Sequence, residues 1–96
     1  SDPMKRADRF VEDWKRLNGR RIDAYRAGDM VGMRRIRDDM GAMAKRLERD
    51  PQMESLLAIR KQQLGVGVEM GRKLSHDLAA SIGIDLGRGR GIGIGM

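Results

Sequence analysis

The chain has 96 residues and a mass of 10.8 kDa, enough for one domain. Its 20 Lys and Arg outnumber 14 Asp and Glu, giving a formal charge of +6, and it has no Cys, one His and three aromatic residues. This composition excludes disulfides, Cys nucleophiles, His-rich metal centres and aromatic platforms for single-stranded nucleic acid. We therefore expect a non-enzymatic domain that uses no cofactor and no metal.

The excess positive charge is concentrated in the first half of the chain, and glycine is concentrated near its end. Residues 1–49 carry 14 basic and 9 acidic side chains, residues 50–82 carry four of each, and residues 83–96 carry two Arg and one Asp. No apolar run approaches the roughly 18 residues of a membrane span, and no signal peptide is visible. The absence of Cys and of an export signal predicts a cytoplasmic location.

The sequence pattern of residues 3–27 predicts one long helix. Pro3 suits a first helical turn, because its missing N–H would be unpaired there in any case. Asn18-Gly19 is a turn dipeptide, but the apolar phase resumes correctly beyond it, and we expect a continuous helix that stops at Gly28. The apolar stripe of this helix consists of Ala7, Phe10, Val11, Trp14, Leu17, Ile22 and Tyr25.

Residues 30–49 predict a second helix with Asp29 as its N-cap. Gly32 and Gly41 inside it each cost about 1 kcal/mol relative to Ala, and the close approach of a neighbouring helix is the usual compensation. Its apolar residues form a narrow seam of coiled-coil type: Met30, Met33, Ile36, Met40, Met43 and Leu47.

Residues 51–64 and 69–82 predict two shorter helices. Asp50 is the expected N-cap of the first and Pro51 its first helical residue, and a glycine-rich connector separates the two helices. The expected fold class is all-α, a small bundle of three to four helices over residues 1–83. A flexible tail rich in Gly and Arg is expected over residues 84–96.

Three patterns suggest a catalytic, nucleotide-binding or metal site, and none of them fits such a site. Ser75-His76-Asp77 has the letters of a hydrolase triad, but consecutive helical residues point about 100° apart, and we expect a solvated helix face instead. The glycine-rich stretches lack the spacing of phosphate-binding loops, and no Gly-Lys-Ser/Thr is present. Asp38 and Asp39 stand among arginines, which favours exposed ion pairs over a metal or acid–base site.

Two groups of residues are candidates for binding a partner. One is a basic surface on the first two helices, which consists of Arg16, Arg20, Arg21, Arg26, Arg34, Arg35 and Arg37. An equal alternative is that these residues belong to a solvated face of mixed charge. The other is the tail, which is either a frayed terminus or a linear signal that binds in an acidic groove of a partner. The residues that would contact the partner are Arg88, Arg90, Ile92, Ile94 and Met96.

The order of several stretches resembles the C-terminal end of Ti-type conjugative transfer relaxases, the TraA group, over residues 8–96. The stretches are Ala27-Gly28-Asp29-Met30, Met40-Gly41-Ala42-Met43-Ala44-Lys45, Asp50-Pro51-Gln52-Met53-Glu54-Ser55-Leu56-Leu57, Arg60-Lys61, Leu64-Gly65 and the final Gly-Arg-Gly-Arg-Gly run. In such relaxases the nicking and helicase parts carry the chemistry, and none of their motifs is present here. Tyr25 lies on the apolar stripe and does not match the nicking tyrosine.

The resemblance implies a non-catalytic C-terminal region that recruits the relaxase to type IV secretion. In such relaxases the coupling protein of the channel recognises the C-terminal end and passes the relaxase on with its covalently attached DNA strand. We therefore expect a translocation signal that acts in the bacterial cytoplasm and leaves through the channel. Two alternatives stay open: an accessory DNA-binding domain, and a structural module that dimerises through the Met-rich seam.

Overall fold

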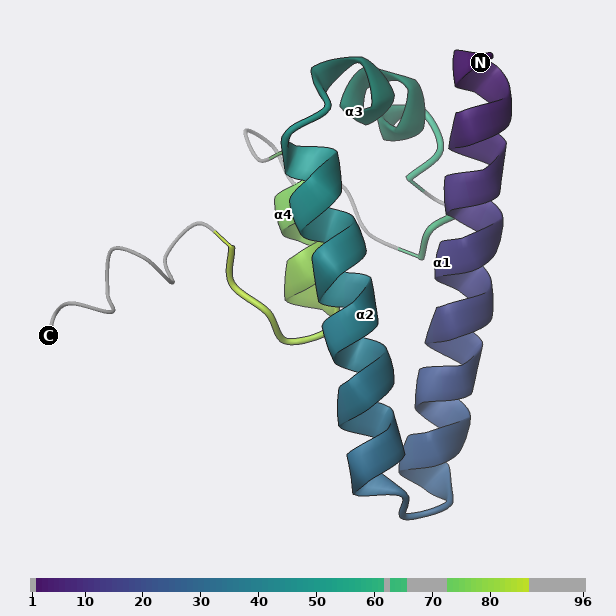
Figure 1. Cartoon of the computed structure of the whole chain (residues 1–96), viewed down its shortest axis with the longest axis vertical. Helices are drawn as coiled ribbons and strands as arrows, with labels where there is room; N and C mark the ends of the chain where they lie inside the picture. Colours follow the sequence, from purple (N-terminus) through teal and green to yellow (C-terminus); the bar gives the residue numbers. More distant parts are fainter. Residues whose placement is uncertain (1, 62, 66–72, 87–96) are drawn as a thin grey trace, which may run out of the picture.

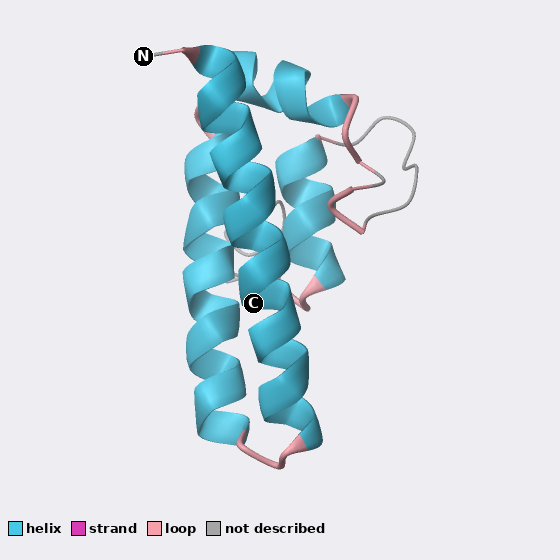
Figure 2. Ribbon diagram, turned by 90° about the vertical axis from the view of Figure 1, so that its right-hand side faces the viewer, coloured by secondary structure: helices cyan, strands magenta, loops and turns pink. Residues whose placement is uncertain are grey.

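The computed structural model describes residues 2–61, 63–65 and 73–86, which form four helices and no strand (Figure 1). The all-α prediction is confirmed. The long helices form an antiparallel hairpin, α3 lies across one end of it, and α4 packs beside α2 (Figure 2). The four helices are α1 (Pro3–Arg26), α2 (Met30–Glu48), α3 (Pro51–Ala58) and α4 (Leu74–Ser81).

The first three helices begin where an Asp side chain caps their free N–H groups. Asp29 accepts a hydrogen bond from the Gly32 N–H at 2.9 Å, and Asp50 accepts one from the Met53 N–H at 3.2 Å. Both predicted N-caps are therefore confirmed. Gly28, with φ +79°, ends α1 in a left-handed conformation that glycine adopts without strain.

The core lies where all four helices meet. Each helix contributes one large side chain that is almost completely buried: Trp14, Met40, Leu57 and Leu78. Phe10 stacks on Trp14 with 6.2 Å between ring centroids. The far end of the hairpin extends past this core, and Tyr25 is therefore 62% exposed although it continues the apolar stripe of α1.

Several residues of the Met-rich seam of α2 pack in the core of the same chain. Met40 and Leu47 are buried, and Ile36 and Met43 pack against the same core. Met30 at the start of the seam is exposed because it lies beyond α4 and α3. Met40 and Leu47 are thus unavailable as a dimer interface while the chain is folded.

The two shorter helices differ from their predicted bounds of 51–64 and 69–82. α3 ends at Ala58, and the chain turns through hydrogen bonds such as Arg60 N–H to Leu57 C=O at 2.8 Å. This turn places Arg60 in an ion pair with Asp8 of α1, which a continued helix would not provide. α4 begins only at Leu74, because Lys73 has an extended backbone, and residues 69–72 lie outside the described part.

The predicted tail begins too early, since residues 84–86 belong to the bundle. Ile84 and Leu86 are half-buried against the core, and the Ile84 N–H donates to the Ala79 C=O at 2.8 Å. A Cβ on Gly41 would lie 2.5 Å from Ile84 Cδ1. The close approach expected at Gly41 is therefore made by this side chain and not by a helix. Residues 87–96 lie outside the described residues.

The position of α4 can be tested through its central leucine. Leu78 is fully buried, and we expect Leu78→Ala to lower the free energy of unfolding by about 2–5 kcal/mol. Ile59 is 82% exposed, and Ile59→Ala should change it by less than about 0.5 kcal/mol. Urea unfolding of the two variants measures the difference, and equal stabilities would contradict the docking of α4.

Candidate functional site

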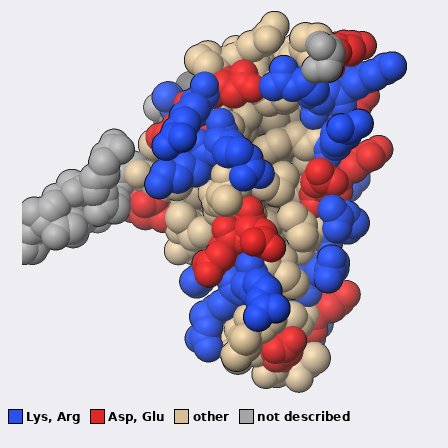
Figure 3. Space-filling model, viewed as in Figure 1, with Lys and Arg blue, Asp and Glu red and all other residues tan. Residues whose placement is uncertain are grey.

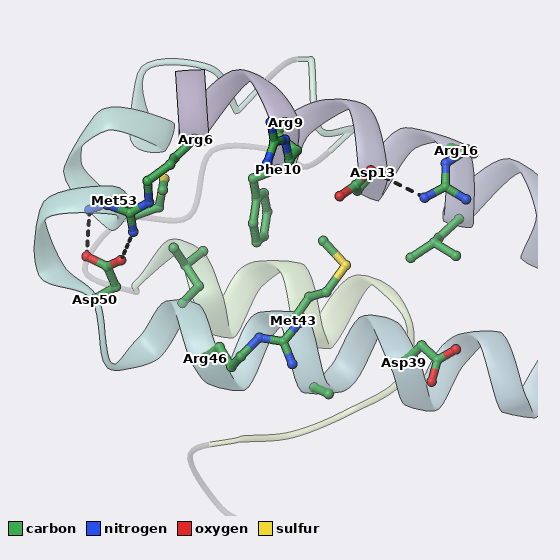
Figure 4. Close-up of a pocket in the computed structure, with 13 residues that line it drawn as sticks. Arg6, Arg9, Phe10, Asp13, Arg16, Asp39, Met43, Arg46, Asp50 and Met53 are labelled. Carbon is green, nitrogen blue, oxygen red and sulfur yellow. Dashed lines mark hydrogen bonds and ion pairs between the residues drawn. The ribbon is translucent and has the colours of Figure 1, made fainter. Parts of the chain in front are cut away.

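A groove runs along the α1–α2 hairpin, on the side away from α4 (Figure 4). It has a volume of about 620 Å³, and the start of α3 closes one end. Its lining extends along α1 from Arg6 to Leu17, which corresponds to about 16 Å at 1.5 Å per residue. The groove is therefore a long channel between two helices and not a compact pocket.

The floor of the groove is apolar. Phe10 and Leu17 contribute from α1, Met43 and Leu47 from α2, and Met53 from α3. Leu47 and Met53 are buried in the core, whereas the other three are only half-buried. These three side chains pack on the core from one side and leave apolar surface open toward the groove.

The rim of the groove is charged, and part of that charge is neutralised internally. Arg6 pairs with Asp50 at 2.8 Å, and Arg16 pairs with Asp13 at 3.3 Å. Arg9 on α1, Arg46 on α2 and Asp39 form no ion pair within the described residues. The unpaired charge at the rim is thus two positive against one negative.

The seven arginines of the predicted basic surface lie on different sides of the hairpin. Arg16 lines the groove, and Arg20 follows one helical turn later on α1. Arg35 stands one turn before the rim residue Asp39 on α2. Helical spacing therefore places these three residues on the groove side. Figure 3 shows that basic and acidic side chains are interspersed on the face drawn there.

The other four predicted arginines do not join this surface. Arg37 lies one turn before Gly41, on the side that faces Ile84, and Arg34 precedes it by three residues. Arg21 donates two hydrogen bonds to Asn18 Oδ1, at 3.2 and 2.8 Å. Arg26 ends α1 at the far end of the hairpin.

Three rim arginines were absent from the predicted set: Arg6, Arg9 and Arg46. Arg6 lies four residues before Phe10 and three before Arg9, and Arg46 lies three residues after Met43, which are spacings of neighbours on one side of a helix. Helical periodicity therefore contains the signal. The sequence does not show which side of the hairpin α4 leaves uncovered, and the arginines at the rim of the groove could therefore not be predicted.

The Ser75-His76-Asp77 run lies in α4, and its three side chains bind three different partners. The Ser75 hydroxyl donates to Glu54 Oε1 at 2.8 Å, His76 Nε2 lies 2.7 Å from Glu48 Oε2, and Lys61 Nζ lies 3.4 Å from Asp77 Oδ2. The side chains diverge, as predicted. The expected solvated face is wrong, however, because Ser75 and Asp77 are buried against the other helices.

Glu54 of α3 caps the start of α4 from outside that helix. Its carboxylate accepts hydrogen bonds from the Ser75 N–H at 3.2 Å and from the Ser75 hydroxyl. The residue at the N-cap, Lys73, makes no side-chain cap. An acidic side chain at a helix N-terminus also complements the helix dipole. These contacts give α4 polar partners on α3 as well as apolar ones.

The acidic pair behaves partly as predicted. Arg37 Nη2 lies 3.6 Å from Asp38 Oδ1, an exposed ion pair, while Asp39 stands at the groove rim. Among the described residues, no group of three or more His, Asp or Glu side chains is arranged to hold a metal ion. No helix in the described part is long and apolar enough to cross a membrane.

The tail residues singled out by the sequence lie outside the described residues. They are Arg88, Arg90, Ile92, Ile94 and Met96. Comparisons of the chain with models of protein families, with curated proteins and with solved structures gave no match. The resemblance to relaxases therefore depends on the sequence pattern alone.

The cap provided by Glu54 gives a second test of the structure. Glu54→Ala would leave a buried Ser75 hydroxyl and N–H without their acceptor, and we expect a loss of about 1–3 kcal/mol in the free energy of unfolding. Glu12→Ala, an exposed acid on α1, is the matched control and should change it by less than about 0.5 kcal/mol. Thermal unfolding of both variants, followed by circular dichroism, measures the effect. Equal melting temperatures would show that Glu54 does not hold α4.

Proposed function

We propose that this chain is a non-catalytic, protein-binding domain at the C-terminal end of a conjugative relaxase, where it acts as a recruitment signal read by the type IV secretion coupling protein. The observation that carries protein binding is the groove, with its half-buried apolar floor and with Arg9 and Arg46, which form no ion pair in the part of the chain that the structure describes. The assignment to a relaxase comes from the sequence resemblance over residues 8–96.

The recruitment has two parts. The bundle presents the groove to the partner, while Arg88 and Arg90 of the tail contact an acidic site. Exposed charge pairs of this kind mainly raise the association rate and make it sensitive to salt. The apolar side chains of Ile92, Ile94 and Met96 supply most of the affinity of the tail, because burying apolar surface slows dissociation.

A DNA-binding domain fits the described residues less well. The predicted basic residues lie on several sides of the hairpin and form no continuous phosphate-binding track. Dimerisation through the Met-rich seam is disfavoured as well, because Met40 and Leu47 are already buried within one chain.

Deleting residues 87–96 tests the role of the tail. Because Ile84 and Leu86 pack on the core, a deletion that begins after Leu86 removes the tail and leaves the bundle intact. We expect the truncated chain to keep its melting temperature and to bind the cytoplasmic domain of the cognate coupling protein at least tenfold more weakly. Arg88→Ser with Arg90→Ser should mainly slow association, and Ile92→Ser with Ile94→Ser should mainly speed dissociation.

Surface plasmon resonance at two salt concentrations measures both rates, and a translocation assay with a reporter fusion gives the corresponding result in cells. Undiminished binding and transfer by the truncated chain would refute the tail as the signal. A mobility shift with single-stranded and duplex DNA accompanies these experiments. Retardation at micromolar protein, together with no binding to the coupling protein, would replace recruitment by DNA binding.

A further inference from the structure

We infer that the groove binds an amphipathic helix of the partner protein, with an apolar stripe that is flanked by Asp and Glu. This inference rests on the proposed function and deepens it, because it names the chemistry of the surface that the partner must present. It concerns the bundle alone and does not involve the tail.

The shape of the groove fits a helix. The lining residues recur along both walls at intervals of three and four, as residues on one side of a helix do: 6, 9, 10, 13, 16 and 17 on α1, and 39, 42, 43, 46 and 47 on α2. Two antiparallel helices leave a groove on each side of their contact. α4 packs on the opposite side of α2, and a third helix of about three turns would fill the open side.

The floor provides apolar contacts for the stripe of such a helix. Phe10 and Leu17 lie seven residues apart on α1, about two turns, and Met43 stands on the opposite wall. All three are half-buried, so a bound helix would remove their remaining apolar surface from water. Met43 has an unbranched side chain that adapts to different apolar partners.

The charged residues at the groove rim favour acidic residues on both sides of the apolar stripe of the bound helix. Arg6 and Arg16 are engaged by Asp50 and Asp13, whereas Arg9 and Arg46, one on each wall, have no acidic partner among the described residues. A helix with carboxylates on both sides of its apolar stripe would place one row near each of these two arginines.

The charge at the rim argues against two other occupants. The charged residues of segment 87–96 are Arg88 and Arg90, so this segment has the same sign as Arg9 and Arg46. Two copies of the chain, each with a net charge of +6, repel one another. The observations therefore favour an acidic segment of a different protein.

A pair of designed peptides tests the inference on the full chain. The first peptide is an amphipathic helix of about five turns with a Leu stripe flanked by Glu, and the second has Lys in place of every Glu. Titration of the ¹⁵N-labelled chain, followed by NMR, locates the binding site. We expect the Glu-flanked peptide to shift the amide signals of groove residues such as Phe10 and Met43, and to bind at least tenfold more tightly than its Lys-flanked twin.

Charge reversal at the rim completes the test. Arg9→Glu with Arg46→Glu should weaken binding of the Glu-flanked peptide at least tenfold and strengthen binding of the Lys-flanked peptide. Lys15→Glu with Arg34→Glu is the matched control, since these exposed residues lie outside the groove lining, and it should change either affinity less than about twofold. Circular dichroism establishes that both double variants are folded.

Other outcomes would refute the inference or the proposed role of the tail, and the experiments distinguish the two. Failure of the Glu-flanked peptide to perturb the groove at millimolar concentration, or equal losses in both double variants, would exclude a specific acidic helix. Perturbation of the groove by duplex DNA, with no effect of the peptide, would assign it to nucleic acid. If truncation after Leu86 leaves binding of the coupling protein unchanged while the peptide occupies the groove, only the proposed role of the tail fails. If truncation abolishes that binding and the peptide does not bind, only the groove assignment fails.

Discussion

The packing of one large buried side chain from each helix is the constraint on which the rest of the structure depends. Trp14, Met40, Leu57 and Leu78 meet in a single core, and full burial of such side chains contributes about 1.5–3 kcal/mol each for the aliphatic ones. This core occupies the half of the hairpin nearest α3, and α3 and α4 pack against it there. As a consequence α4 covers one side of the hairpin, while the other side keeps its apolar residues half-exposed.

Polar contacts determine how α4 sits in that core. Three consecutive residues of α4 bind three partners from other parts of the chain: Ser75 with Glu54, His76 with Glu48, and Asp77 with Lys61. Buried polar groups are costly unless they are paired, so any rotation of α4 would leave several of them unsatisfied. The apolar core attracts α4, and these pairs define its orientation. The uncovered side of the hairpin, and with it the groove, follows from both.

Features that depend on neighbours in the sequence could be predicted, and features that depend on distant neighbours could not. Asp29 and Asp50 cap their helices through the next three residues, so their roles were visible from the sequence. The end of α3 at Ala58 depends on a turn that brings Arg60 to α1, and the burial of Ser75 depends on α3. The rim was missed for the same reason, since periodicity defines the sides of a helix and not which of them stays open.

The groove and the tail carry the same sign of charge, which restricts a partner that uses both. Leu86 is packed on the core, and Arg90 is the fourth residue after it, so the backbone of Arg90 lies within about 14 Å of that point. A partner with an acidic helix in the groove must therefore also place its acidic site for Arg88 and Arg90 close to Leu86. Each contact is weak alone, because it relies on two arginines: Arg9 and Arg46 at the rim, which have no acidic partner among the described residues, and Arg88 and Arg90 in the tail. Because the groove and the tail belong to one chain, the second contact forms at a high effective concentration once the first is made. Two modest interactions then give one selective complex.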